Sequence, residues 1–247
     1  MESLSSYHPK SKILLIPGPI EVHGSVLTNE SAVSHVDKGF IKQFGDAIKL
    51  LRCVVLSEEV QPFIITGSGS IGWELFTNNF IDGHKTLIVS TGYFGRSFKE
   101  VFESADLPHE YLFSGFGKIP SVEEVLRAIE INKCTAVTFT HVDTSTGVRC
   151  NLDDYVGPIR KKYPEILIAV DGVCSIGGEI LDMSKTDVDF VMTGSQKALG
   201  ALAGLSISWA SKRALVIYVY LESIGTKKEN SFLLLQFKEM DSNSQCL

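Results

Sequence analysis

Residues 187–204, DVDFVMTGSQKALGALAG, decide how the rest of this chain is interpreted. An apolar run at 190–192 leads through a polar turn to Gln196 and Lys197, and small residues follow. A lysine amine becomes nucleophilic when it is desolvated or placed near another cation, and it can then form a Schiff base. The small residues would leave room for a flat cofactor. The alternative is a solvated surface lysine on a polar turn, which is the usual environment of lysine.

Length and composition limit the class of protein. The chain has 247 residues, of which 44% are hydrophobic, and this fits one large domain or one domain with an appendage. The net charge is −6 and no basic patch is present, which argues against nucleic acid and anionic membranes as partners. The cysteines, at 53, 134, 150, 174 and 246, form no CxxC pair, and the six histidines show no metal-binding spacing. We therefore expect a reducing compartment and no metal.

The chain shows no targeting or membrane signal. The first residues, MESLSSYHPKSK, lack both an apolar core and an arginine-rich pattern. The longest apolar run, 214–221, is too short to span a bilayer, and the final Gln-Cys-Leu matches neither a prenylation box nor a peroxisomal signal. We expect a soluble, cytoplasmic protein, with a peroxisomal or mitochondrial location left open.

Strand-like apolar runs alternate with helical periodicities along the chain. The expected strands are 62–66, 86–90, 110–113, 135–140, 167–170, 190–192 and 205–209. The expected helices are 39–58, 71–80, 94–105, one that starts at 120–124 with a capping box, and 152–163. This alternation predicts an α/β fold with a largely parallel sheet.

Polar motifs follow five of the expected strands. They are GSGS at 67–70, TGYFG at 91–95, HVDTSTG at 141–147, DGV at 171–173 and TGSQK at 193–197. Ligands of open α/β sheets bind beyond the carboxyl ends of the strands. We therefore expect these motifs to meet at one edge of the sheet.

Each motif has both a functional and a plain interpretation. The glycines of 67–70 precede a helix and could cradle phosphate with backbone N–H groups, or form only a tight turn. Asp171 ends an apolar run and needs a cation such as a protonated pyridine nitrogen, unless it caps a helix or forms a structural salt bridge. Phe94 could stack on a heterocycle or pack in the core. Taken together with the turn hydroxyls and Lys197, these are the parts that pyridoxal phosphate (PLP) requires.

Several segments resemble one enzyme family. HVDTSTGV, VDGVCSIGG, DFVMTGSQKALGALAGLSIS, LLIPGPIEV and QPFIITGSGSIGWE are similar to segments of the class V, fold-type I PLP-dependent aminotransferases. Within that family the chain looks most like the fungal alanine–glyoxylate aminotransferases, a group that overlaps the serine–pyruvate aminotransferases. The resemblance runs from about residue 12 to residue 211. It implies a three-layer αβα large domain at 1–211 around a mainly parallel mixed sheet.

The resemblance implies roles around the cofactor ring. Lys197 would form the Schiff base with PLP, and Asp171 would pair with the pyridine N–H. Val173 and Phe94 would cover the two ring faces. Family members often have Trp where this chain has Phe94, so stacking should persist but weaken. Thr144 would lie near the phenolic oxygen of the ring.

Other roles concern the phosphate and the substrate. Gly69 and Ser70 would bind the phosphate through backbone and hydroxyl, and Gln196 would help to hold the phosphate side. Gly18, in the Pro-Gly-Pro turn, would offer its backbone to the substrate carboxylate. The implied reaction is ping-pong transamination, in which alanine and glyoxylate give pyruvate and glycine. Its partners are a small amino acid and a 2-oxo acid, and the family is homodimeric.

The chain departs from the family after about residue 211. Members continue into a small C-terminal domain with an arginine that grips the substrate carboxylate, whereas residues 212–247 form a divergent tail. The only arginine after Lys197 is Arg213, which lies in no matching motif. The apolar runs 214–221 and 232–237 would either cover exposed sheet or stay exposed.

Two alternatives to an active aminotransferase stay open. The first is a truncated, inactive fragment that still binds PLP or a full-length subunit. The second is a cysteine desulfurase, which shares the fold and the lysine. A desulfurase needs a mobile catalytic cysteine, and none of the cysteines lies in a recognisable loop of that kind.

Overall fold

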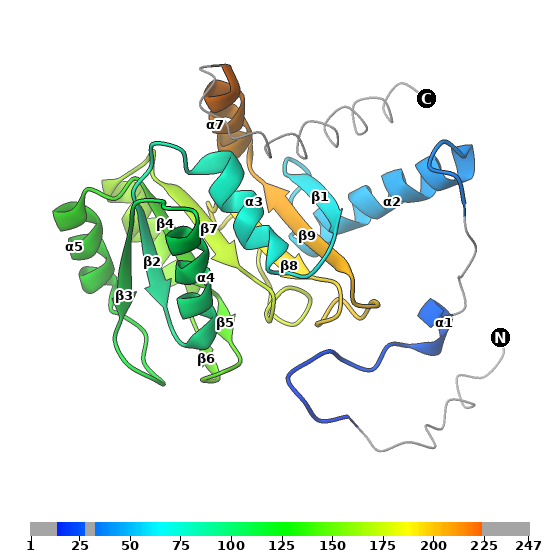
Figure 1. Cartoon of the computed structure of the whole chain (residues 1–247), viewed down its shortest axis with the longest axis horizontal. Coiled ribbons are helices and arrows are strands. Elements are labelled where there is room, and N and C mark those ends of the chain that lie inside the picture. The colour runs from blue at the N-terminus through cyan, green and yellow to red at the C-terminus, as the bar shows by residue number, and fades with distance from the viewer. Residues whose placement is uncertain (1–13, 28–32, 224–247) are drawn as a thin grey trace.

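A computed structural model describes residues 14–27 and 33–223 and has the expected α/β fold (Figure 1). Its main sheet has seven strands in the order β1-β9-β8-β7-β4-β2-β3. The strands are β1 (Gln61–Thr66), β2 (Thr86–Ser90), β3 (His109–Phe113), β4 (Ala136–Thr140), β7 (Leu167–Asp171), β8 (Phe190–Gly194) and β9 (Leu205–Ala210). A separate hairpin contains β5 (Val142–Asp143) and β6 (Val148–Arg149).

The strand directions explain why the polar motifs share one edge. Strands β3, β2, β4, β7 and β8 are parallel neighbours, whereas β9 is antiparallel to both β8 and β1. Because two reversals restore the direction, β1 runs the same way as β8. The loop at 67–70 therefore leaves the sheet at the same edge as the loops after β4, β7 and β8. The central strands β2, β4 and β7 are buried along their whole length, as expected for strands covered on both faces.

Helices cover both faces of the sheet and complete a three-layer architecture. They are α2 (Lys38–Val54), α3 (Ile71–Phe80), α4 (Tyr93–Ser104), α5 (Val122–Asn132), α6 (Leu152–Lys162) and α7 (Lys212–Ser223). The four-residue helix α1 (Gly24–Leu27) buries no residue and lies apart from the sheet (Figure 1). The buried side chains of α5 and α6 pack on one face, and those of α3, α4 and α7 pack on the other.

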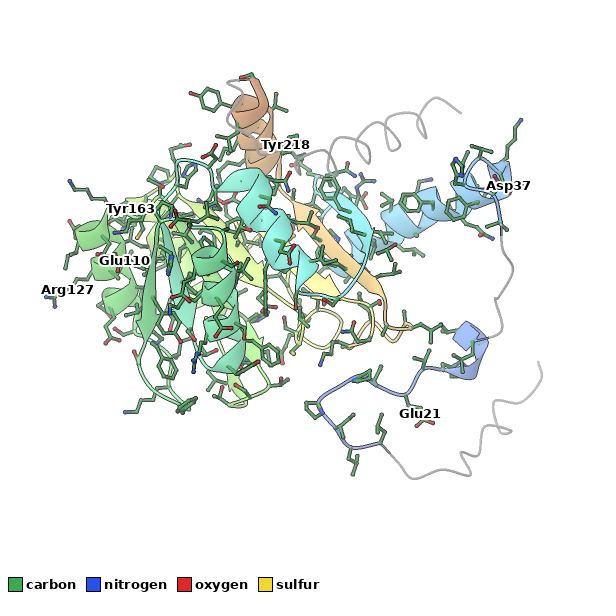
Figure 2. All side chains as sticks on the ribbon, in the orientation of Figure 1. Glu21, Asp37, Glu110, Arg127, Tyr163 and Tyr218 are labelled. Atoms are coloured by element: carbon green, nitrogen blue, oxygen red, sulfur yellow. The ribbon has the colours of Figure 1, made fainter. Side chains whose placement is uncertain are left out.

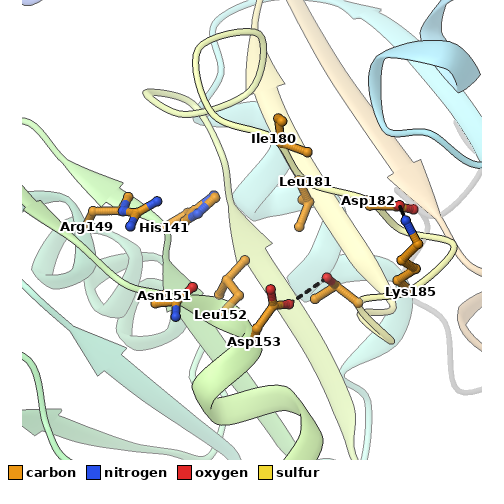
Figure 3. Close-up of a pocket in the computed structure, with 10 residues that line it drawn as sticks. His141, Arg149, Asn151, Leu152, Asp153, Ile180, Leu181, Asp182 and Lys185 are labelled. Atoms are coloured by element: carbon orange, nitrogen blue, oxygen red, sulfur yellow. Dashed lines mark hydrogen bonds and ion pairs between the residues drawn. The ribbon is translucent and has the colours of Figure 1, made fainter.

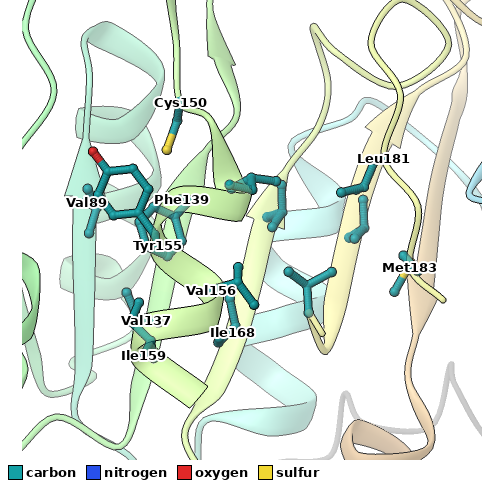
Figure 4. Packing of buried hydrophobic residues seen from close by; sticks show 14 of the residues in the cluster. Val89, Val137, Phe139, Cys150, Tyr155, Val156, Ile159, Ile168, Leu181 and Met183 are labelled. Atoms are coloured by element: carbon teal, nitrogen blue, oxygen red, sulfur yellow. The ribbon is translucent and has the colours of Figure 1, made fainter. Parts of the chain in front are cut away.

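The first core lies between the sheet and helices α5 and α6 (Figure 4). Phe139 of β4 meets Tyr155 of α6 with ring centroids 5.3 Å apart, and Tyr155 donates its hydroxyl to Pro120 O at 2.7 Å. The second core is aromatic, with the side chains of Phe76, Phe80, Phe98 and Phe190 all buried. Fully burying each such ring contributes roughly 1.5–3 kcal/mol, so the aromatic layer holds α3 and α4 firmly on the sheet.

The helix ends expected from the sequence agree with the structure, with one exception. The predicted capping box is confirmed, because Glu124 N donates to Ser121 Oγ and Ser121 N donates to Glu124 Oε2. The expected helix 39–58 is too long, since α2 ends at Val54. Leu56 then has φ 53°, a left-handed conformation that reverses the chain toward β1.

Helix α7 begins the tail and packs on the sheet layer (Figure 2). Ala214, Tyr218 and Leu221 are buried, and the Tyr218 ring lies 6.3 Å from that of Phe80. One side of the apolar run 214–221 therefore covers the fold, whereas Val216, Val219 and Tyr220 on its other side stay exposed. The run 232–237 lies outside the described residues, and the division of domains at residue 211 stays a prediction. Among the described helices, none has the length and apolar content that a bilayer crossing requires.

Candidate active site

Lys197 lies in the loop between β8 and β9, where its amine meets the N-terminal segment. Its Nζ donates to Pro17 O at 2.8 Å, across 180 positions of sequence. Gly18 has φ 114°, and a Cβ at that position would come within 2.5 Å of Lys197 Nζ. Glycine is therefore required both by the backbone conformation and by the approach of the lysine. The structure thus brings the Pro-Gly-Pro turn and Lys197 together.

The loop that carries Lys197 is fixed by its own hydrogen bonds. Ser195 N donates to Leu205 O at 3.0 Å, and Ser195 Oγ donates to Leu202 O at 2.6 Å. Gly200 N donates to Lys197 O at 2.9 Å. These bonds close the loop on itself, so Lys197 is held next to the sheet edge and is only partly exposed.

Asp171, the last residue of β7, is a buried acid, only 3% exposed, with neutral partners. Its Oδ1 accepts from Val173 N at 3.0 Å, and its Oδ2 accepts from Trp73 Nε1 at 3.1 Å. Burial raises the pKa of Asp171 to about 6, although both hydrogen bonds act in the opposite direction. Within the described part of the chain no cation pairs with Asp171, so the alternative of a structural salt bridge is wrong for these residues.

Asp171 and Lys197 follow adjacent parallel strands and lie in one electrostatic neighbourhood. The Cys174 thiol, in the turn after β7, is influenced by both of them. Burial raises the pKa of Cys174, the Lys197 charge lowers it, and the Asp171 charge raises it. Thr144 Oγ1 lies 3.8 Å from Cys174 Sγ, so the hydroxyl-rich turn faces the same place. An arrangement with Asp171 and Lys197 on opposite sides of the molecule is excluded.

The loop at 67–70 approaches the turn after β7. A Cβ on Gly69 would lie 2.9 Å from Val173 Cγ2, so only glycine permits this packing. The backbone N–H groups of Gly69 and Ser70 donate to no acceptor in the described part of the chain. Ser70 is the N-cap of α3, and its side chain makes no cap hydrogen bond. Free donors at a helix N-terminus suit a phosphate group.

Gln196, the residue before Lys197, packs on the end of β8. Its Oε1 is buried without a hydrogen-bond partner among the described residues, and a Cβ on Gly194 would lie 2.6 Å from it. Gln196 O accepts from Ile20 N at 3.1 Å. A buried acceptor without a donor is costly, so this amide fits a site where a ligand supplies the missing hydrogen bond.

Phe94 begins α4 and is held by the hairpin of β5 and β6. Phe94 N donates to Asp143 Oδ2 at 3.1 Å, and Tyr93 N donates to Ser145 Oγ at 2.9 Å. Ser145 Oγ donates in turn to Asp143 Oδ1 at 2.6 Å. The Phe94 ring is half-buried, with one side packed on the aromatic core. Both sequence interpretations of Phe94, core packing and an accessible ring, are therefore compatible with its position.

Two residues of this edge had no assigned role in the sequence analysis, namely Trp73 and Asp143. Trp73 belongs to one of the family-like segments, and its partner Asp171 is 98 positions away. Asp143 lies in the hydroxyl-rich turn, and its partner Phe94 is 49 positions away. Neither contact has a local sequence signal, because each depends on how a helix packs across the sheet.

A separate hollow of about 380 Å³ lies near the start of α6 (Figure 3). Its charged side chains largely neutralise one another. Arg149 pairs with Glu179 at 2.9 Å, and Lys185 pairs with Asp182 at 2.7 Å. None of the nine predicted site residues lines it, so it is not part of the candidate active site.

Comparison with known proteins identifies the family. The model of the family "Aminotransferase class-V" matches residues 114–242, which is about half of the chain. The chain belongs to the class-V aminotransferases. Alanine–glyoxylate aminotransferase 1 of Saccharomyces cerevisiae is 38% identical over 210 residues, which cover 81% of this chain and 54% of the yeast protein.

Solved structures of two glyoxylate aminotransferases have the same fold. An alanine–glyoxylate aminotransferase from Nostoc is 30% identical, has a TM-score of 0.79, and matches 88% of this chain and 58% of its own. Ureidoglycine–glyoxylate aminotransferase from Bacillus subtilis is 25% identical, has a TM-score of 0.82, and matches 90% of this chain and 57% of its own. The chain therefore spans somewhat more than half the length of these relatives.

Proposed function

We propose that this chain binds PLP between Lys197 and Asp171, and that its reaction is the transamination of alanine with glyoxylate. The observation that carries the proposal is the buried Asp171 carboxylate, which has only neutral partners among the described residues and lies one strand away from a lysine amine. A protonated pyridine nitrogen is the cation that such a carboxylate lacks, and the aldehyde of PLP is the group that the amine would bind.

The residues at this edge fit the different parts of PLP. The N–H groups of Gly69 and Ser70, which have no acceptor in the described part of the chain, suit its phosphate. Gln196 Oε1, which has no donor there either, lies on the same side, because both Gly69 and Gln196 pack on Gly194. Val173 and Phe94 would cover the two faces of the ring, and the Thr144 hydroxyl would serve its phenolic oxygen. These assignments rest on the family resemblance together with the positions of the side chains.

The protein's own groups then have distinct tasks in transamination. Bound PLP supplies an electron-accepting ring. With PLP bound, the Lys197 amine would be the group that takes the proton from the substrate Cα. The Asp171 carboxylate would hold a negative charge at the opposite end of the site and favour a protonated ring nitrogen. The overall exchange converts alanine and glyoxylate into pyruvate and glycine.

A second candidate, a chain that binds PLP without turnover, is favoured by the position of Arg213. Its guanidinium donates to Asp187 Oδ1 at 3.1 Å and to Asp189 Oδ1 at 2.8 Å. These aspartates precede β8, whereas Lys197 follows β8, so Arg213 lies at the opposite edge of the sheet. It is therefore not placed to hold a substrate carboxylate, and Gly18 is left as the candidate from the sequence analysis for that contact.

Titration of the full chain with PLP tests both candidates. Visible absorbance should report the Schiff base with Lys197, and the Lys197→Ala variant should lose that band. Lys185→Ala, at a surface lysine paired with Asp182, is a matched control that should retain it. Pyruvate formed from alanine plus glyoxylate supports the aminotransferase. A PLP band without pyruvate supports the inactive fragment, and no band in the unmodified chain contradicts both.

We further propose that a second copy of the chain completes the site, as in the homodimers of the family. The N-terminal segment that contacts Lys197 carries exposed apolar side chains, including Leu15, which is 90% exposed, and Ile16. Such side chains are suited to burial against another subunit. Light scattering with and without PLP should give a dimer mass, and a monomer under both conditions would contradict this proposal. The cytoplasmic location stays a prediction.

The desulfurase alternative is less consistent with the described cysteines. Cys174 is the cysteine nearest the candidate site, but it lies in the turn directly after β7 rather than in a separate loop. Burial raises its pKa, so the nucleophilic thiolate is disfavoured.

A further inference from the structure

Trp73, in the first turn of helix α3, reaches the cofactor acid proposed above. Its side chain is buried, with 6% exposure, and it stacks on Phe98 with ring centroids 5.4 Å apart and an interplanar angle of 15°. The packing of α3 on β8 is close, because a Cβ on Gly72 would lie 2.6 Å from Met192 Cβ. The indole is therefore held in one place, with its N–H directed at Asp171 Oδ2.

We propose that Trp73 is a positioning residue, whose indole N–H fixes the orientation of the Asp171 carboxylate and favours its ionised form for pairing with a cationic ring nitrogen. The inference rests on the proposed function, because it gives Trp73 a task only where Asp171 has a cation to meet. A role in the core alone would explain the stacking on Phe98, but it would not require the N–H to meet a carboxylate.

Each of the two carboxylate oxygens of Asp171 accepts one hydrogen bond. Val173 N holds Oδ1 at 3.0 Å, and Trp73 Nε1 holds Oδ2 at 3.1 Å. Hydrogen bonds to an ionised acceptor are roughly twice as strong as those between neutral groups. Without the indole donor, Oδ2 would be buried with one partner fewer, and the carboxyl group would favour its protonated form or rotate.

Because of its surroundings, Asp171 titrates close to neutral pH, so the hydrogen bond from Trp73 affects its charge in that range. Burial raises its pKa to about 6, and the charge of Asp143 from β5 adds to that effect. Cys174, in the following turn, and Lys197, after β8, are the other titratable groups in this neighbourhood. A protonated Asp171 cannot neutralise a pyridinium. The Trp73 N–H, which favours the ionised carboxylate, therefore also affects the pH range in which Asp171 can pair with the ring nitrogen.

Tryptophan fluorescence tests the contact without any cofactor. The chain has two tryptophans, and Trp209 is a natural control because its Nε1 donates to the backbone oxygen of Leu51 at 2.9 Å. In the Trp209→Phe variant, Trp73 is the sole tryptophan, and its emission should change with a midpoint near pH 6. Adding Asp171→Asn should abolish that step. A step that persists in the double variant, or no step in the Trp209→Phe variant, would overturn the inference.

Trp73→Phe then tests the consequence for the cofactor. Phe keeps an aromatic ring beside Phe98 but lacks the N–H. We expect PLP affinity at pH 7 to fall about tenfold, since loss of one charge-assisted hydrogen bond corresponds to roughly that factor. The lower pH limit of PLP binding should move upward, toward neutral pH. Trp209→Phe, the same substitution at the other buried indole, should leave that pH limit unchanged.

The failure of this inference can be told apart from the failure of the proposed function. If the unmodified chain takes up no PLP, the proposed function fails, while the fluorescence step in the cofactor-free chain can still appear. If Trp73→Phe lowers the melting temperature but leaves the PLP pH limit unchanged, Trp73 is a core residue only and the inference is wrong.

Discussion

Asp171 and Asp189 are two buried acids at opposite edges of the same sheet, and they are satisfied in different ways. Asp171 ends β7 and Asp189 precedes β8, with exposures of 3% and 0%. Asp189 forms ion pairs with Arg160 and Arg213, and it also accepts from Ser211 Oγ at 3.0 Å and from Ile168 N at 2.9 Å. Among the described residues, Asp171 accepts only from Val173 N and Trp73 Nε1.

Within the described residues, the difference separates a buried acid that is fully paired inside the fold from one that lacks a cationic partner. A buried carboxylate is costly unless it is paired and hydrogen-bonded. Asp189 meets both conditions: it ties α6 and α7 together through Arg160 and Arg213, and it holds β7 through Ile168 N. Asp171 meets only the second, and the unmet condition is what a cationic cofactor would supply. The same substitution at the two positions should therefore have opposite effects on stability.

Asp189→Asn should give the largest effect. The variant leaves the buried Arg160 guanidinium, and part of Arg213, without their shared anion. Removing one partner of a buried ion pair costs about 3–5 kcal/mol. Urea denaturation of the cofactor-free chain should show this loss. A loss below about 1 kcal/mol, the size typical of an exposed pair, would mean that the network is not a structural anchor.

Asp171→Asn should instead stabilise the cofactor-free chain at pH 7. The pKa of Asp171 is raised from 3.8 to about 6 by burial, so keeping it ionised costs the folded state up to about 3 kcal/mol. The gain should be smaller than that limit, because the amide of Asn would turn an N–H group toward one of the two donors, Val173 N or Trp73 Nε1. The same variant should lose PLP binding. Destabilisation at pH 7 would show that the charge of Asp171 is already compensated.

The pH dependence of the free energy of unfolding also tests the comparison between Asp171 and Asp189. The folded pKa of Asp171 lies above its unfolded value, so the folded state binds the proton more tightly. The stability from this group is fully present below about pH 4 and is lost as the pH rises through about 6. The stability difference between Asp171→Asn and the unmodified chain should therefore grow by at most about 1.4 kcal/mol per pH unit across that window. A difference that does not change with pH would remove titration of Asp171 as its cause.

The sequence predicts which motifs gather at one edge of the sheet, but it does not predict the side-chain contacts that these motifs make there. Alternating apolar runs and helical periods place five polar motifs after strands, and parallel strands bring such ends together. The antiparallel β9 and the early end of α2 were not predicted, because each depends on tertiary pairing and on the reversal at Leu56. The partners of Asp171 and Asp189 were also not predictable. Trp73 lies 98 positions from Asp171, and Arg160 lies 29 positions from Asp189.

Arg213→Lys should give the smallest loss of stability. It also tests whether the edge around Asp189 acts on stability without acting on cofactor binding. Arginine reaches Asp187 and Asp189 with a planar fork, whereas the lysine ammonium is a single point charge. Loss of one of these contacts at a partly exposed site should cost about 1 kcal/mol, measurable by urea denaturation.

Because Arg213 lies at the edge opposite Lys197, its replacement should leave PLP affinity unchanged. If the chain turns over alanine and glyoxylate, the KM for alanine should also stay the same, since Arg213 is committed to the anchor around Asp189. A rise in KM without a loss of stability would place Arg213 at the substrate. It would then contradict the proposed division between a structural edge around Asp189 and a cofactor-binding edge around Asp171.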